Sequence, residues 1–222
     1  MSSSASPSTF APSALPEILP IFPLAGVVLL PRGRLPLNVF EPRYLAMIED
    51  ALGHGRLIGM IQPTISEDEM PVPPLYQVGC AGRISSFTET DDGRFLVNLT
   101  GVCRFQVTEE LPQLRGYRRI KPEWKNFQGD VGPIEETEFD RASLMSVLRP
   151  YFKAHGIAAD WNAVQNTTGE MLISSLAMIC PLEPSEKQAL VEAPNLDARA
   201  KLLITLLEMA SVPQHDNENA RH

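Results

Sequence analysis

Few side chains in this sequence have the types and spacing that catalysis or metal binding requires. The four histidines are far apart, and none has a second His, Cys or Asp at metal-ligand spacing on a predicted helix or hairpin. They are His54, His155, His215 and His222. His54 and His155 follow predicted helices, where a cation is stabilised by the helix dipole. We therefore interpret these two as helix-end residues and expect no metal ion.

The three cysteines, Cys80, Cys103 and Cys180, are far apart and surrounded by apolar residues. An odd number in such contexts is typical of reduced thiols, not of a disulfide framework. Each could in principle be a nucleophile. However, Cys80 and Cys103 occupy inward positions of predicted strands, and burial raises the pKa of a thiol. Core packing is therefore the favoured interpretation, and reduced thiols indicate a cytoplasmic protein.

Motifs for nucleotide binding and for peptide hydrolysis are not found in the sequence. It contains no GxxxxGK[ST] loop to hold phosphates and no GxSxG nucleophile turn. An unrecognised hydrolase would have only generic carboxylates and hydroxyls in its favour. We therefore expect a protein that is not an enzyme, with no cofactor and no bound ATP.

The segment 115–125, RGYRRIKPEWK, mixes basic and aromatic residues as single-stranded nucleic-acid surfaces do. The candidate residues are Arg115, Tyr117, Arg118, Arg119, Lys121, Trp124 and Lys125. The net charge of −8 argues against a general nucleic-acid binder. A solvated strand face that pairs with the acidic 130–140 region explains the same charges without a ligand. RNA binding is therefore kept as the alternative function.

The elements that would position such residues begin with the stretch 18–52. Prolines divide its apolar first half into pieces of strand length, and they lie where strands begin or end. A helix is predicted to start at Pro42, with Glu41 at the positive end of the helix dipole and Gly53 as its stop. Arg43 either pairs with Glu41 or a loop, or it belongs to a polar edge beside a ligand groove.

The pattern after this unit is that of strands and then of helices. Residues 56–62 and 76–108 predict strands, with a hairpin turn at Asp92-Gly93 and a sharp bend where Gly82 could face Gly101. One more strand is predicted over 114–124. The first half is therefore a small, strongly bent sheet or barrel with one helix. Four or five helices follow, including one that Asp160 caps, one over 184–192 and one that Asn195 caps.

The order of these motifs resembles the opening of the N-terminal domain of Lon proteases. The matching residues are LPIFPL at 19–24, VLLP at 28–31, LPL at 35–37 and FEPRY at 40–44, and residues 181–208 are similar to that region's helical part. The resemblance covers nearly all of 18–210. It implies a stand-alone N-terminal domain, because the ATPase and the serine–lysine peptidase of full-length Lon are not present.

Pattern and resemblance together predict an α+β protein, in which a PUA-like small β-barrel with one amphipathic helix precedes a C-terminal α-helical bundle. We expect the barrel over 17–125, a linker over 126–137 and the bundle over 138–210. Polar segments at 1–16 and 211–222 are expected to be disordered tails. No apolar run approaches the ~20 residues of a membrane helix, and no secretory or mitochondrial leader is evident.

The resemblance also implies a function, namely non-catalytic binding of proteins or unfolded polypeptide segments, together with self-association. The protein would then be an adaptor or regulator in protein quality control. We expect capture in a groove between barrel and helices, by apolar contacts and by strand addition at a barrel edge. The candidate contact residues at the strand-to-helix junction are Leu30, Pro31, Phe40, Arg43 and Tyr44, with Phe40 expected to be buried.

Overall fold

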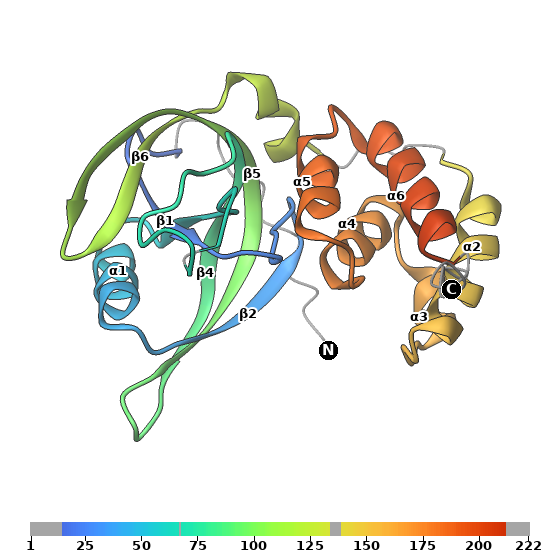
Figure 1. Cartoon of the computed structure of the whole chain (residues 1–222), viewed down its shortest axis with the longest axis horizontal. Coiled ribbons are helices and arrows are strands. Elements are labelled where there is room, and N and C mark those ends of the chain that lie inside the picture. Colours follow the sequence, from blue (N-terminus) through green and yellow to red (C-terminus); the bar gives the residue numbers. More distant parts are fainter. Residues whose placement is uncertain (1–14, 67, 134–138, 212–222) are drawn as a thin grey trace, which may run out of the picture. The chain divides into compact units, whose positions relative to one another are not determined.

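The computed structural model describes residues 15–66, 68–133 and 139–211 (Figure 1). The predicted tails lie almost wholly outside these residues. By their internal contacts, the described residues form two compact units. The first comprises residues 15–66 and 68–133 with Ser174–Glu192, and the second comprises residues 139–173 with 193–211. The predicted subdomain boundary at 126–137 stays a prediction.

The first unit is built on a mixed sheet of six strands within the described residues. The strands are β1 Leu19–Pro23, β2 Arg34–Val39, β3 Leu57–Ile61, β4 Val78–Glu89, β5 Phe95–Leu114 and β6 Tyr117–Glu123. Their order in the sheet is β2-β5-β4-β3-β1-β6. Strands β1 and β3 are parallel, and every other pairing in the sheet is antiparallel.

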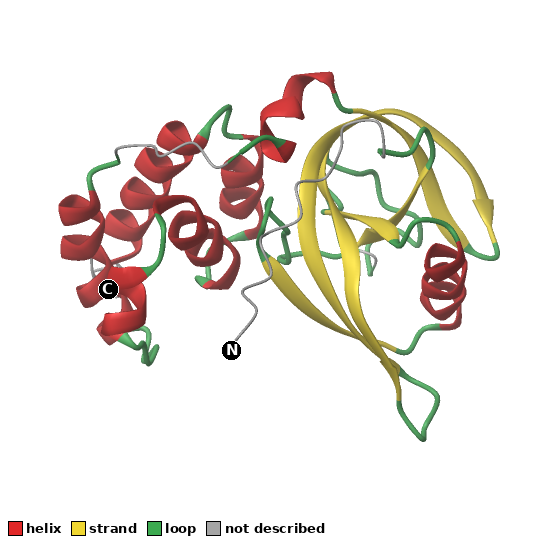
Figure 2. Ribbon diagram, turned by 180° about the vertical axis from the view of Figure 1, so that it is seen from behind, coloured by secondary structure: helices red, strands yellow, loops and turns green. Residues whose placement is uncertain are grey.

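The sheet is bent round on itself, but it is not the closed PUA-like barrel that we expected. Strand β5 pairs with β2 and β4 through its first half and with β6 through its second half. The sheet therefore curls, as the strands in Figure 2 show. Among the described strands, β2 pairs with β5 alone and ends the strand order. The pairing of β6 with both β1 and β5 brings five of the strands back onto one another, but β2 lies outside them as an edge strand. A simple closed barrel has no edge strand, so the barrel prediction is corrected to a curled mixed sheet.

The bend in the β4–β5 hairpin coincides with two glycines, as the sequence predicted. Gly82 lies opposite Gly101 in the register, next to a register shift between Ala81 and Gly82. A Cβ atom at Gly101 would overlap the carbonyl oxygen of Leu30 and lie 2.8 Å from its carbonyl carbon. Glycine is therefore needed at this position, because the backbone of Leu30 passes directly against the strand.

Helix α1, Pro42–Gly53, closes one side of the sheet. Pro42 begins it, as predicted, and Glu41 occupies the N-cap position. Its buried face contributes Tyr44, Met47 and Ile48 to the larger hydrophobic core, in which the rings of Phe22 and Tyr44 lie 4.1 Å apart. A second, smaller hydrophobic cluster of the same unit contains Leu19, Ile21 and Phe105. The amphipathic helix predicted from the sequence is thus present, but the Glu41 side chain makes no capping hydrogen bond, and Gly53 is the last helical residue, with His54 at the C-cap position.

Strand β5 is longer than the alternation in the sequence indicated. It continues to Leu114, and the chain then reverses at Arg115 and Gly116, whose φ angles are 48° and 87°. Leu114 pairs with Tyr117, so the reversal is a two-residue hairpin turn. We had predicted a single strand over 114–124. The Arg-Gly turn was missed because only its second residue is a common turn former.

The predicted helices are present in the described residues after 139. The second unit contains α2 Arg141–Ala154, α3 Trp161–Asn166 and α6 Leu196–Ser211, while α4 Gly169–Ile179 begins in it. Asp160 and Asn195 cap α3 and α6 as expected, through hydrogen bonds of 2.9 Å from Asn162 N and Ala198 N. Helix α5, Pro184–Glu192, belongs to the first unit, as does a short 3-10 helix at Lys125–Val131. The arrangement of all these helices as one bundle remains a prediction.

Candidate functional site

The five residues predicted to contact a partner divide into buried and exposed members. Leu30 and Tyr44 are 0% and 3% exposed, and Pro31 is also buried, so these three support the junction from inside. Phe40 is 61% exposed. The expectation that Phe40 is buried is therefore wrong. It fails because Phe40 lies between the end of β2 and the start of α1, where neither element covers it.

Arg43 adopts the local arrangement that the physics of a helix start suggested. Its Nε donates to the Glu41 carboxylate at 2.9 Å, and its guanidinium lies 4.5 Å from the centre of the Tyr44 ring. Both partners of the ion pair are partly exposed, at 31% and 43%. Exposed pairs of this kind contribute little to stability, so the pair positions Arg43 at the partly exposed start of α1 without stabilising the fold much.

Phe40 belongs to an exposed apolar surface that the sequence did not reveal. The guanidinium of Arg94 lies 5.9 Å from the centre of its ring. Leu96, which is 46% exposed, alternates with the buried Phe95 and Val97, and so it points to the outer face of the sheet. Pro36 on β2 is exposed in the same way. We call the set Pro36, Phe40, Arg94 and Leu96 the outer patch.

Pro36 of the outer patch lies on β2 and Phe40 directly follows it, and among the described strands the edge of β2 opposite β5 has no partner. Gly101 N donates to the Gly33 oxygen at 2.8 Å, so the next pair in the register, Arg34 with Thr100, is a non-hydrogen-bonded pair. The backbone N–H and C=O groups of Arg34 therefore point away from β5. Because hydrogen-bonded and non-hydrogen-bonded pairs alternate along the strand, the backbone groups of Pro36 and Asn38 also point away from β5. Pro36 has no N–H, so the free edge offers the N–H groups of Arg34 and Asn38 and three carbonyl groups.

The basic stretch at 115–125 is distributed among ion pairs and buried contacts. Arg115 donates to Glu49 and Asp50, at 2.7 Å each. Arg118 is 7% exposed and binds both carboxylate oxygens of Glu110, at 2.7 Å each. Tyr117 is 3% exposed and donates to Asp50 at 2.8 Å. Burial, together with this hydrogen bond, raises the pKa of Tyr117 to about 12.

The remaining members of the stretch are also engaged, apart from one exposed lysine. Arg119 donates to the Pro112 oxygen at 2.9 Å, and Lys121 to Glu109 at 2.6 Å. Trp124 donates to the Pro16 oxygen at 3.1 Å, and Lys125 is exposed. The carboxylates lie at 49–50 and 109–110, not in the 130–140 region that we expected. The reason is the Arg115-Gly116 turn, which folds β6 back onto β5 and beside α1.

All three cysteines are buried and unbridged, as expected. Burial raises the pKa of Cys103 to about 12 and that of Cys180 to about 12. His54 and His155 follow α1 and α2 as predicted. In the part of the chain that the structure describes, no cluster of three or more His, Cys, Asp or Glu could hold a metal ion. None of the described helices is both long enough and apolar enough to cross a membrane.

The folded protein is expected to react slowly with thiol reagents at pH 8. Because the pKa of Cys103 and of Cys180 lies near 12, both stay protonated there, and burial blocks access to them. Ionisation of the unfolded thiols should also lower the free energy of unfolding as the pH rises from about 9 toward 12. The rate of thiol reaction is measured with a chromogenic disulfide before and after denaturation. A fast stoichiometric reaction of the native protein would contradict the assignment.

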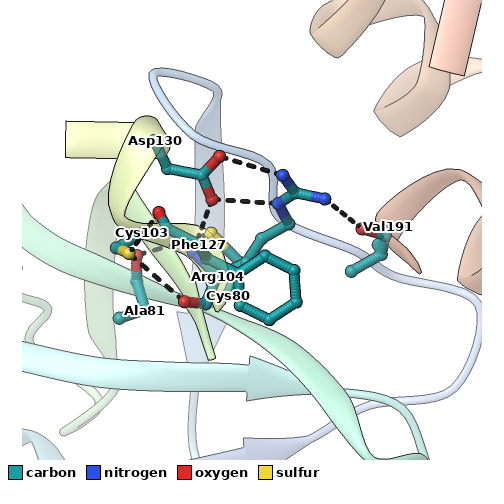
Figure 3. Close-up of polar contacts among 7 residues, drawn as sticks. All are labelled: Cys80, Ala81, Cys103, Arg104, Phe127, Asp130 and Val191. Carbon is teal, nitrogen blue, oxygen red and sulfur yellow. Dashed lines mark hydrogen bonds and ion pairs between the residues drawn. The ribbon is translucent and has the colours of Figure 1, made fainter. Parts of the chain in front are cut away.

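A buried ion pair in the first unit was not singled out from the sequence (Figure 3). Arg104 on β5 is 4% exposed and binds both carboxylate oxygens of Asp130, at 2.9 Å and 3.0 Å. Its third contact is to the Val191 oxygen of α5 at 3.0 Å, and its guanidinium lies 4.6 Å from the centre of the Phe127 ring. Arg104 therefore joins β5, the 3-10 helix and α5, and its role is structural.

Comparison with known proteins gives a consistent result. The profile of the substrate-binding domain of ATP-dependent protease La (LON) matches residues 18–209. Lon protease 2 of Myxococcus xanthus is 28% identical over 214 residues, which are 92% of this chain and 26% of that protein. Lon protease 2 of Sorangium cellulosum is 34% identical over 206 residues, 88% of this chain and 25% of that protein. The chain thus spans about a quarter of the length of these relatives.

Solved structures share the fold. A Lon N-terminal domain protein from Xanthomonas campestris superposes with a TM-score of 0.61 at 23% identity, covering 85% of this chain and 97% of that one. The N-terminal domain of Mycobacterium avium complex Lon protease gives a TM-score of 0.55 at 14% identity, covering 86% and 97%. The mixed sheet with its several helices is therefore a Lon N-terminal domain fold.

Proposed function

Because this chain belongs to the family of Lon substrate-binding domains, we propose that it is a non-catalytic module that captures unfolded polypeptide segments along the edge of β2. The observation that carries the proposal is the free edge of β2 beside the exposed Phe40. An extended segment would add to the sheet as a further antiparallel or parallel strand. Its alternate side chains would contact the outer patch.

Backbone pairing and apolar contact have separate roles in this arrangement. The N–H groups of Arg34 and Asn38 and the carbonyl groups between them can bond to any extended backbone, which gives affinity without a required sequence. Phe40 and Leu96 would select for apolar side chains, because their exposed surface is removed from water on binding. Unfolded proteins offer both features, whereas folded proteins conceal their backbone and their apolar residues. The site therefore suits recognition of unfolded protein.

In this proposal the predicted junction residues have different roles. Phe40 makes the main apolar contact, and Arg43 borders it at the start of α1. Leu30, Pro31 and Tyr44 hold the junction in shape from within the core. An adaptor or regulatory role in protein quality control follows if the captured segment is passed to a protease. Self-association at the same edge would compete with capture, because one edge accepts one strand.

Replacing Phe40 and Leu96 together by serine is expected to weaken binding of an unfolded polypeptide at least about tenfold. Each exposed apolar side chain contributes about 1 kcal/mol or more when it is covered, and about 1.4 kcal/mol corresponds to a factor of ten. The measurement is fluorescence anisotropy of a labelled, reduced and carboxymethylated polypeptide titrated with protein. Circular dichroism spectra of the two proteins should agree.

The matched control is Leu114→Ser, which removes an apolar side chain that is 41% exposed at the far end of β5. This variant should bind like the wild type. Equal binding by the Phe40→Ser/Leu96→Ser variant would show that the outer patch is not the contact surface. The alternative, RNA binding through 115–125, would appear as affinity for an RNA oligonucleotide that increases steeply at low salt.

A further inference from the structure

The second unit contains an open hollow of about 480 Å³ at the end of α2 and the start of α3. Its volume lies within the roughly 300–1,000 Å³ of ordinary small-ligand sites. All of its lining comes from one stretch of chain, namely Arg149, Phe152, Lys153, Ile157, Ala158, Ala159 and Trp161. Figure 1 shows α2 and α3, the two helices that contribute to it.

Two cations border the hollow. Arg149 and Lys153 are four residues apart on α2, so their side chains lie on one face of the helix, and both are exposed. The Arg149 guanidinium lies 4.4 Å from the centre of the Trp161 ring. Within the described residues, neither cation is paired with a carboxylate. They differ in this from Arg115, Arg118 and Lys121 of the first unit, each of which has a carboxylate partner.

The base of the hollow is apolar and its wall is fixed. Phe152 is buried, and its ring lies 5.7 Å from that of Trp161. Ile157 N donates to the Phe152 oxygen at 2.8 Å, which anchors the loop that follows α2. The neighbouring carboxylate, Asp160, accepts from Asn162 N at 2.9 Å and Ala163 N at 3.2 Å, so its charge is directed to the start of α3. The site is therefore formed before any ligand arrives.

We propose that this hollow is a second binding site, for a short peptide segment in which an aspartate or glutamate adjoins an apolar side chain. The carboxylate would pair with Arg149 and Lys153, and the apolar side chain would pack against Phe152, Ile157 and Trp161. Charge complementarity supports this occupant, because the two cations form a positive site on a chain whose net charge is −8.

A peptide fits this site better than a nucleic acid does. Base stacking needs an open aromatic face, and the Trp161 ring is already contacted by the Arg149 guanidinium and by Phe152. The binding would not involve β2, so the second unit would select segments by charge while the β2 edge accepts extended backbone of any sequence. The two sites together would favour unfolded chains with acidic, apolar stretches.

The test uses the fluorescence of Trp161 in the full chain. The sequence contains two tryptophans, so Trp124→Phe leaves Trp161 as the reporter. Titration with an acetylated Gly-Leu-Asp-Phe-Glu-Gly peptide should change its emission to saturation. The analogue with asparagine and glutamine in place of the acids should bind at least tenfold more weakly. Equal binding of the two peptides, or no saturable change, would overturn the proposal.

Variants then separate this site from the β2 edge. Arg149→Gln with Lys153→Gln should weaken binding of the acidic peptide at least tenfold, as measured by the Trp161 emission of the Trp124→Phe protein, which reports the hollow and not the β2 edge. Lys125→Gln with Lys201→Gln makes the same change in net charge elsewhere and should stay within twofold of the parent. The Phe40→Ser/Leu96→Ser variant should also bind the acidic peptide normally. Loss of binding in either control, with unchanged thermal stability, would show that the hollow is not the site.

Discussion

Replacing Gly101 by alanine is expected to destabilise the first unit by at least about 3 kcal/mol, or to prevent folding. A Cβ atom there would overlap the carbonyl oxygen of Leu30 and lie 3.2 Å from the Cα of Pro31. These are backbone atoms, so no change of side-chain rotamer relieves the overlap. Either the segment around Leu30 must move off the hairpin or β5 must shift relative to β4, and both changes open the core around Leu29 and Leu99.

Urea unfolding followed by circular dichroism measures this effect, with the midpoint and slope determined for wild type and variant. Gly53→Ala is the matched control, because a Cβ at Gly53 meets nothing within 4 Å and the residue ends α1. That change should be neutral or slightly stabilising, since alanine is the better helix former. A Gly101→Ala protein as stable as the Gly53→Ala protein would show that Leu30 does not approach β5 as described.

Replacing Asp130 by alanine should destabilise the protein by about 3–5 kcal/mol, since it leaves a buried guanidinium without its counter-charge. The side chains of Arg104 and Asp130 are only 5% and 12% exposed. Asp130 also accepts from the backbone N of Arg104 at 2.9 Å, so the variant loses three hydrogen bonds at one carboxylate. The contact from Arg104 to the neutral Val191 oxygen does not replace this counter-charge.

Two comparisons make this result specific. Asp197→Ala removes an exposed pair with Lys201 on α6 and should cost less than about 0.5 kcal/mol. Arg104→Met combined with Asp130→Leu should recover much of the stability, because an apolar pair in place of a buried ion pair is often tolerated. Thermal and urea unfolding provide both values. An Asp130→Ala protein that unfolds at the wild-type urea concentration would contradict the structural role assigned to Arg104.

The parts of the fold that were predicted correctly have local signals in the sequence. Pro42 as the start of α1, Asp160 and Asn195 as caps, and the Asp92-Gly93 turn each depend on residues within a few positions of one another. The facing glycines, Gly82 and Gly101, were found because both interrupt the same hairpin. Such features need no knowledge of tertiary contacts.

The features that were missed depend on contacts between distant residues. Arg104 lies in an alternating strand and reads as a solvent-facing residue, and its partner Asp130 is 26 positions away. Phe40 is a large apolar residue in an apolar run, which predicts burial. Only the positions of β2 and α1 leave it exposed. A closed barrel was expected, but β2 has only one partner strand among the described residues. No pattern in the sequence shows how many partners a strand will have.

The central claim is that a bound polypeptide adds to the edge of β2, and amide hydrogen exchange tests it most directly. Exchange is followed by NMR on the protein alone and saturated with an unfolded polypeptide probe. The N–H groups of Arg34 and Asn38 point away from β5, whereas those of Leu35 and Leu37 already face it. The account predicts slower exchange at Arg34 and Asn38, with little change at Leu35 and Leu37. Saturated binding with unchanged exchange at Arg34 and Asn38 would contradict it.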